Sequence, residues 1–96
     1  MKFFKKVKHI HFVGIGGAGM IGIAKVLLKK GYKISGSDIS DSRELRKLEK
    51  HGAKVFIGHS SKNIKGADLI VISSAISSRN PELVQAKKDS ITSIPR

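Results

Sequence analysis

The sequence contains no cysteine, no tryptophan and only two prolines, and these scarcities exclude several classes of protein. Without cysteine, a disulfide framework, a thiolate zinc site and a cysteine nucleophile are all excluded. No apolar run approaches the roughly 20 residues that a membrane-spanning helix needs. The 96 residues are enough for one compact domain, and the lack of cysteine suits a cytoplasmic protein.

Acidic residues are also scarce, since 7 of them stand against 19 lysines and arginines and leave a formal net charge of +12. This charge favours anionic partners, whether nucleic acid, anionic lipid or a phosphorylated small molecule. The basic residues are spread along the chain, and an aromatic content of 5% offers little surface on which bases could stack. A nucleic-acid-binding module is therefore only an alternative, and neither nucleic acid nor a membrane is predicted as a partner.

The chain begins with lysines that resemble the start of a secretory leader. Glycines from Gly14 to Gly19 interrupt the apolar segment that should follow such lysines, so secretion is not predicted. The lysines concerned are Lys2, Lys5, Lys6 and Lys8.

Short apolar runs alternate with segments of helical periodicity along the whole chain. The predicted strands are residues 9–13, 32–37, 54–57, 68–73 and 91–94, and the predicted helices are residues 18–31, 41–52 and 80–88. This alternation predicts an α/β fold, a Rossmann-like doubly wound parallel sheet of about five strands with helices on both faces. We expect residues 1–96 to form a single domain.

Residue types at the predicted helix ends support these boundaries. Asp41 and Glu44 have the spacing of a capping box, and Asn80-Pro81 is typical of a helix cap followed by the first helical residue. The segment from Gly58 to Gly66 is polar and is predicted to be irregular. Residues 68–73 are the most apolar strand and are expected to be buried on both faces.

Gly14-Ile15-Gly16-Gly17-Ala18-Gly19 matches the pattern G-x-G-x-x-G, placed after the first strand and before the first helix. Gly14 suits a tight turn, Gly16 lets a phosphate approach bare backbone, and Gly19 lets the helix lie close to the sheet. Unpaired amides and the positive end of the helix dipole would then face an anion. Gly22, one turn further on, predicts still closer packing. The alternative is a glycine-rich turn that serves packing alone.

Parallel sheets of this kind bind ligands at the carboxyl ends of their strands. Asp38 ends the second predicted strand beside Ser37, and its carboxylate is a candidate acceptor for ribose hydroxyls; otherwise it only begins a turn. His59 follows the third strand, where an imidazole could bind a base or a phosphate or be a bystander. Ser73 and Ser74 end the fourth strand and are predicted to line the same pocket.

The sequence lacks the motifs of several kinds of catalytic site. No G-x-x-x-x-G-K-[ST] loop for ATP and no nucleophile-elbow sequence occurs, and no pair of histidines has metal-ligand spacing. His9 and His11 alternate along one strand and are expected to be structural, with their ring nitrogens satisfied. The chain is therefore predicted to contain no catalytic residue and no metal site.

Seven blocks of sequence, taken together, resemble the amino-terminal domain of the Mur ligase family, in the branch that joins L-alanine to UDP-N-acetylmuramic acid. The resemblance covers essentially all 96 residues in order. It departs from the family at Ile21, where a small residue is usual, and in the turn at residues 41–43. The blocks are residues 11–20, 36–38, 52–55, 58–59, 66–68, 73–76 and 80–82.

The resemblance implies a bacterial enzyme of three domains, of which this chain is the first, acting in the synthesis of the peptidoglycan precursor. In that family the first domain holds the UDP part of the substrate. ATP and Mg²⁺ act elsewhere in the enzyme, where an acyl phosphate forms. The remaining domains of the ligase are the implied protein partners, and this segment alone is predicted to be inactive.

The resemblance also assigns residues to the ligand. The glycine loop would meet the diphosphate, Asp38 and His59 would lie beside the uridine, and the serines after the fourth strand would line the pocket. The full set is Gly14, Gly16, Gly17, Ala18, Gly19, Met20, Ser37, Asp38, His59, Ser73, Ser74 and Ala75.

A dinucleotide-binding protein is the main alternative. A sensor for NAD(H), or one half of a dehydrogenase, would share the glycine loop and the acidic residue at the end of the second strand. The length of 96 residues argues against a dehydrogenase, because a complete dinucleotide site uses two mononucleotide-binding halves.

Overall fold

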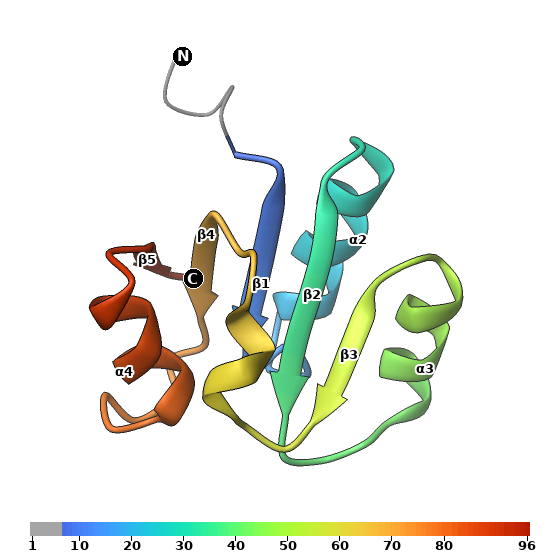
Figure 1. Ribbon diagram of the computed structural model, residues 1–96. Helices are drawn as coiled ribbons and strands as arrows, with labels where there is room; N and C mark the ends of the chain where they lie inside the picture. Colours follow the sequence, from blue (N-terminus) through green and yellow to red (C-terminus); the bar gives the residue numbers. More distant parts are fainter. Residues whose placement is uncertain (1–6) are drawn as a thin grey trace.

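A parallel sheet with helices on both faces is the framework of this computed structural model, which describes residues 7–96 (Figure 1). Lys2, Lys5 and Lys6, which were considered as part of a leader, lie outside the described residues. The elements in chain order are β1 (His9–Val13), α2 (Met20–Lys29), β2 (Lys33–Asp38), α3 (Arg43–Lys50), β3 (Lys54–Ile57), the 3₁₀ helix η1 (Ser61–Ile64), β4 (Leu69–Ile72), α4 (Pro81–Lys88) and β5 (Thr92–Pro95).

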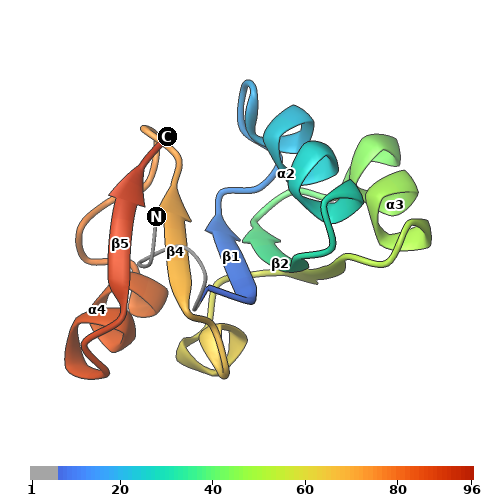
Figure 2. The ribbon, with the colours of Figure 1, turned by 90° about the horizontal axis from the view of Figure 1, so that it is seen from above.

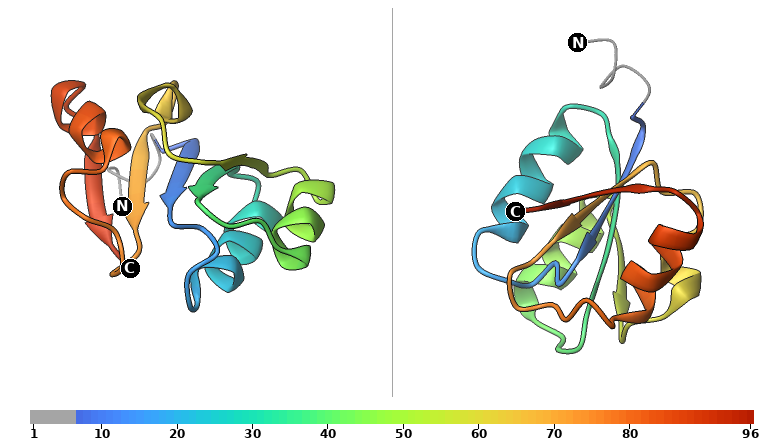
Figure 3. Two further views of the ribbon diagram at one scale, coloured as in Figure 1. Left: turned by 90° about the horizontal axis from the view of Figure 1, so that it is seen from below. Right: turned by 90° about the vertical axis from the view of Figure 1, so that its left-hand side faces the viewer.

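The five strands lie in the order β3-β2-β1-β4-β5, and every neighbouring pair is parallel. Helices α2 and α3 cover one face, and η1 and α4 cover the other (Figure 2). Figure 3 shows the same two layers of helix from below and from the side. The strand order reverses direction between β1 and β4, so the predicted doubly wound, Rossmann-like fold is confirmed.

The central strand β1 is buried along its whole length, and its side chains divide between the two faces. Ile10 and Phe12 belong to the larger apolar cluster, which includes Met20 and Ala24 of α2 and Leu45 of α3. The smaller cluster on the other face is Val13, Ile64, Ala67, Ile70 and Ala86. The prediction for the fourth strand largely holds, because only the last residue of β4 is partly exposed.

Three predicted details of the helices were wrong. Ser42, and not Asp41, caps α3, since the hydroxyl of Ser42 accepts a hydrogen bond from the amide of Leu45 at 3.2 Å. The Asp41 carboxylate instead pairs with Arg46 at 2.7 Å. Helix α2 begins at Met20, two residues later than predicted, and the polar stretch expected to be irregular contains η1. The Asn80 cap of α4 is confirmed, because its side chain accepts from the amide of Glu82.

Two further properties concern residues 7–96 only. None of their helices combines the length and the apolar character needed to cross a membrane. Their His, Asp and Glu side chains form no group of three that could hold a metal ion.

Candidate functional site

The glycine loop connects β1 to α2 at the carboxyl edge of the sheet, and Gly14 and Gly19 have φ values of +81° and +76°. These values are in the left-handed region, which glycine adopts without strain. A Cβ atom on Gly14 would also lie 2.8 Å from the Cβ of Ser73. The loop therefore needs glycine at both ends.

Some backbone amides of this loop already donate hydrogen bonds within the protein, so fewer amides than the six-residue motif suggests are free to bind an anion. The amides of Gly14 and Ile15 donate to the carbonyl of Ser37, and that of Gly17 donates to the carbonyl of Gly14. Met20 likewise donates to the carbonyl of Gly17. The amides of Ala18, Gly19 and Ile21 have no acceptor within the described part of the chain. The unpaired donors therefore lie at the start of α2, where the helix dipole is positive.

The side chain of Asp38 occupies space beside Gly16, where the sequence predicted that a phosphate would approach bare backbone. Its Oδ2 accepts from the amide of Gly16 at 2.9 Å, and its Oδ1 accepts from the amide of Ser40 at 3.1 Å. A Cβ atom on Gly16 would lie 2.9 Å from the same Oδ2. Glycine at this position therefore gives the carboxylate room, and the carboxylate fastens the loop to the end of β2.

Arg96 was not predicted as a site residue, yet its guanidinium lies against the start of α2. A Cβ atom on Gly19 would be 2.6 Å from Nη2 of Arg96. The amide of Arg96 donates to the carbonyl of Ile72, and this bond places the residue beside the end of β4. A cation thus lies next to the unpaired amides, which adds to the attraction for an anion.

The serines after β4 differ in their surroundings. Ser73 is buried, and its Oγ is 2.9 Å from where a Cβ of Gly17 would stand, so it packs against the glycine loop. Ser74 and Ala75 are exposed. The structure therefore brings Ser73 to the loop and leaves its two successors at the surface near it.

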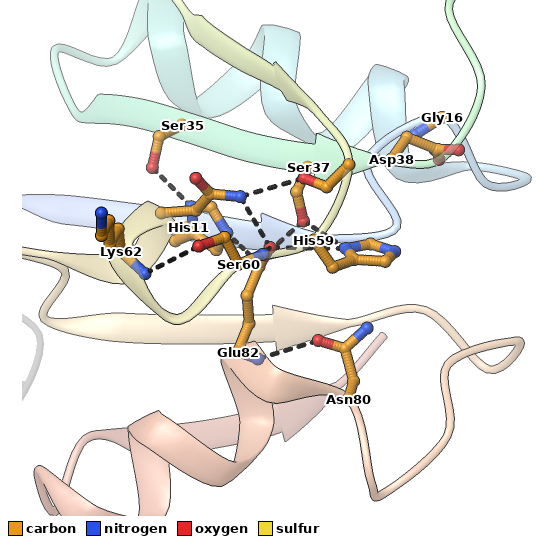
Figure 4. A network of polar contacts seen from close by, with 12 residues as sticks. His11, Gly16, Ser35, Ser37, Asp38, His59, Ser60, Lys62, Asn80 and Glu82 are labelled. Carbon is orange, nitrogen blue, oxygen red and sulfur yellow. Dashed lines mark hydrogen bonds and ion pairs between the residues drawn. The ribbon is translucent and has the colours of Figure 1, made fainter.

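Ser37 and His59 meet at the ends of β2 and β3, since Nδ1 of His59 lies 2.8 Å from Oγ of Ser37. Both are joined to Glu82 at the start of α4 (Figure 4). The Glu82 side chain has no exposed surface, and its carboxylate also contacts Nε2 of His11 at 2.6 Å. The amide of Ser60 and the side chain of Asn63 donate to its Oε2.

Hydrogen bonding keeps the Glu82 carboxylate charged although burial opposes the charge. Bonds from His11, Ser37 and Asn63 outweigh the burial and lower the pKa of Glu82 to about 2. His11 also contacts Oγ of Ser35 through Nδ1, and Nε2 of His9 contacts the same oxygen. The prediction that the ring nitrogens of His9 and His11 are satisfied is thus confirmed for both nitrogens of His11 and for Nε2 of His9.

A parallel sheet with a glycine loop after its central strand places the chain in the class of Rossmann-like α/β domains. The model of the "Mur ligase family, catalytic domain" matches residues 9–96. The chain belongs to the Mur ligase family.

Individual relatives agree with this family. The chain is 53% identical to the UDP-N-acetylmuramate–L-alanine ligase of Persephonella marina, with 98% of this chain and 20% of that protein covered. It is 56% identical to the ligase of the same name from Nitrosospira multiformis, with 95% and 18% covered. The crystal structure of UDP-N-acetylmuramate–alanine ligase from Thermotoga maritima matches with a TM-score of 0.88 at 36% identity, covering 94% of this chain and 21% of that one. The chain thus spans about a fifth of the length of these relatives.

Proposed function

We propose that this chain is the part of a UDP-N-acetylmuramate–L-alanine ligase that binds the UDP moiety of UDP-N-acetylmuramic acid. Relatives with that name cover nearly all of the chain at 53% and 56% identity. The observation that carries the proposal is the unpaired amides at the start of α2 beside the guanidinium of Arg96. Amides at a helix N-terminus and a nearby cation attract a diphosphate.

The ligand would lie along the carboxyl edge of the sheet. Its diphosphate would bind the amides of Ala18 and Gly19 and the side chain of Arg96, with Ser73 beneath the loop. Asp38, whose oxygens each retain a lone pair, would accept from the ribose hydroxyls. His59 would face the uracil, and Ser74 and Ala75 would border the entrance.

The reaction itself would take place outside this chain. The sequence has no G-x-x-x-x-G-K-[ST] loop, so we assign ATP and Mg²⁺ to the remainder of a three-domain enzyme. The UDP group would supply binding energy remote from the reacting carboxylate and so position that carboxylate for activation and for attack by L-alanine. Residues 1–96 would form the first domain, working in the bacterial cytoplasm with the remaining domains of the ligase as partners, and would be inactive alone.

Calorimetric titration of the chain with UDP-N-acetylmuramic acid, UDP and uridine tests this proposal. We expect weak, saturable binding of the first two and weaker binding of uridine, because uridine lacks the diphosphate. NADH, titrated in parallel, should bind less well than UDP. Absence of heat with UDP-N-acetylmuramic acid at millimolar concentration would contradict the proposal.

The variant Arg96→Gln directly tests the proposed diphosphate-binding site. Removing this cation should weaken UDP binding by about tenfold and leave uridine binding unchanged. Lys88→Gln removes one positive charge from the last turn of α4, which lies on the face of the sheet opposite α2, and is the matched control. If both variants weaken UDP binding equally, only the overall charge attracts the ligand.

A further inference from the structure

His59 is connected to the buried carboxylate of Glu82 both directly and through Ser37 (Figure 4). The hydroxyl of Ser37 lies 2.7 Å from Oε1 of Glu82, and Nδ1 of His59 lies 2.8 Å from the same hydroxyl. Nδ1 is also 3.4 Å from Oε2 of Glu82. The side chain of His59 is 13% exposed, whereas that of Glu82 is fully enclosed.

The direction of each hydrogen bond follows from counting protons. An ionised carboxylate can only accept, so the one proton of the Ser37 hydroxyl goes to Glu82. The hydroxyl oxygen then offers only lone pairs to His59, and the nearby Oε2 is an acceptor too. Nδ1 therefore carries a ring proton, and in the singly protonated imidazole Nε2 carries a lone pair.

This lone pair is at the ligand edge of the sheet, where Figure 4 shows His59 on the same side as Asp38 and Gly16. Within residues 7–96, Nε2 of His59 has no hydrogen-bond partner. The ends of β1, β2 and β3 lie side by side and present in turn the glycine loop, Asp38 and His59. A nucleotide with its diphosphate at the loop and its ribose at Asp38 has its base at His59.

We propose that Nε2 of His59 accepts a hydrogen bond from the N3–H group of uracil, and that Glu82, acting with Ser37, holds the imidazole in the tautomer that does so. This inference rests on the proposed function and adds to it the group that selects the base. Glu82 is in this respect a positioning residue, since it acts through His59.

The chemistry of the bases turns this arrangement into a selection for uracil. N3 of uracil carries a proton, N3 of cytosine carries a lone pair, and N3 of 3-methyluracil carries a methyl group. A fixed acceptor pairs with the first, repels the second and is blocked by the third. A site that makes such a bond rejects analogues that leave its polar group unpaired.

Titration of the 96-residue chain with UDP, CDP and 3-methyluridine diphosphate tests the selection. We expect UDP to bind about tenfold more tightly than the other two, and His59→Ala to bring the three dissociation constants within about twofold. If the chain binds UDP and CDP equally, or if His59→Ala keeps the preference, the inference is wrong and the proposed function still stands. If none of the three binds, the proposed function itself fails.

The tautomer can be measured without any ligand, by long-range proton–nitrogen correlation NMR of the chain with isotope-labelled histidine. The unsubstituted chain should show His59 protonated at Nδ1. Glu82→Gln should give a mixture of tautomers and reduce the preference for UDP over CDP to less than about threefold. Glu44→Gln, an exposed glutamate on α3, should change neither.

The spectrum of the unsubstituted chain decides the matter even if Glu82→Gln does not fold. A His59 ring protonated at Nε2 overturns the inference, because such a ring would present a donor to the base. A Glu82→Gln variant that folds and keeps a single Nδ1–H tautomer overturns the role of Glu82.

Discussion

Glu82 is a charged side chain placed where water does not reach, at the second residue of α4. Its partners belong to β1, β2 and the segment after β3, so one carboxylate joins four parts of the fold. Each partner directs a hydrogen-bond donor at Glu82, and a neutral or apolar replacement would leave some of these donors unpaired. Such unpaired buried groups cost more free energy than an ordinary hydrogen bond contributes.

We predict that Glu82→Gln lowers the free energy of unfolding by about 2 kcal/mol. A glutamine amide has one oxygen and one NH₂ group, so one end of it faces donors whichever way it is turned. Urea denaturation should show a lower midpoint with an unchanged slope. Glu44→Gln is the control and should stay within about 0.5 kcal/mol of the parent chain; equal stability of the two variants would contradict the prediction.

The role of Glu82 was not predicted from the sequence, because its partners are as many as 71 positions away and no local pattern joins them. A signal was nevertheless present. His9 and His11 alternate on one strand, and Ser35 and Ser37 alternate on the next, so four polar side chains share one face of the central strands. A buried polar face of this kind requires a partner, and the sequence does not say which element supplies it.

At the scale of elements, the loop between β1 and α2 was predicted in kind but not in detail. The motif gave its position and its tight turns correctly. Which amides are paired depends on Asp38 and Ser37 from β2, and that pairing is a tertiary contact. The predicted close packing at Gly22 was wrong, because a Cβ atom there would meet nothing within 4 Å. The cap of α3 was misplaced by one residue because Asp41 has a stronger partner in Arg46.

Gly19, which caps α2, and Gly22, which lies inside this helix, give a matched pair of predictions. Gly19→Ala introduces a side chain at φ +76° and within 2.6 Å of Arg96, so we expect a loss of about 1 kcal/mol in stability and about tenfold weaker binding of UDP. Gly22→Ala adds a methyl group in open space and should stabilise the helix by up to about 1 kcal/mol with unchanged binding. Thermal unfolding and calorimetric titration measure both effects. The changes in stability of the two variants should have opposite signs. A loss of stability in both would contradict the difference between the crowded Gly19 and the open Gly22.

At the scale of the whole molecule, the two faces of the sheet are held by different forces. The face under α2 and α3 is a continuous apolar cluster, whereas the face under η1 and α4 combines a smaller cluster with the network around Glu82. The sheet, its parallel strands and its two layers of helix followed from the alternation of apolar runs. The polarity of the second face did not, because it depends on which residues meet there.

Because titratable groups hold the second face, we predict that the chain loses stability in acid in two stages. Burial lowers the pKa of His9 below its ordinary 6.5, so the unfolded chain takes up a proton first and stability begins to fall below that pH. The pKa of Glu82 is lowered from 4.5 to about 2, so a second and larger loss occurs between these values. Urea midpoints measured from pH 7 to pH 2 should show both stages.

Two comparisons separate these stages from general charge repulsion, which also grows in acid for a chain with a net charge of +12. Added salt screens repulsion between exposed charges but has little effect on buried groups, so both stages should persist in about 0.5 M sodium chloride. Glu82→Gln should show a smaller second stage and keep the first, because it has no carboxyl group to protonate at that position, while Asp41 and Asp68, whose pKa values are also lowered by hydrogen bonds, still titrate. A stability that rises as the pH falls from 7 to 5, or a second stage of undiminished size in Glu82→Gln, would show that other groups control the acid response.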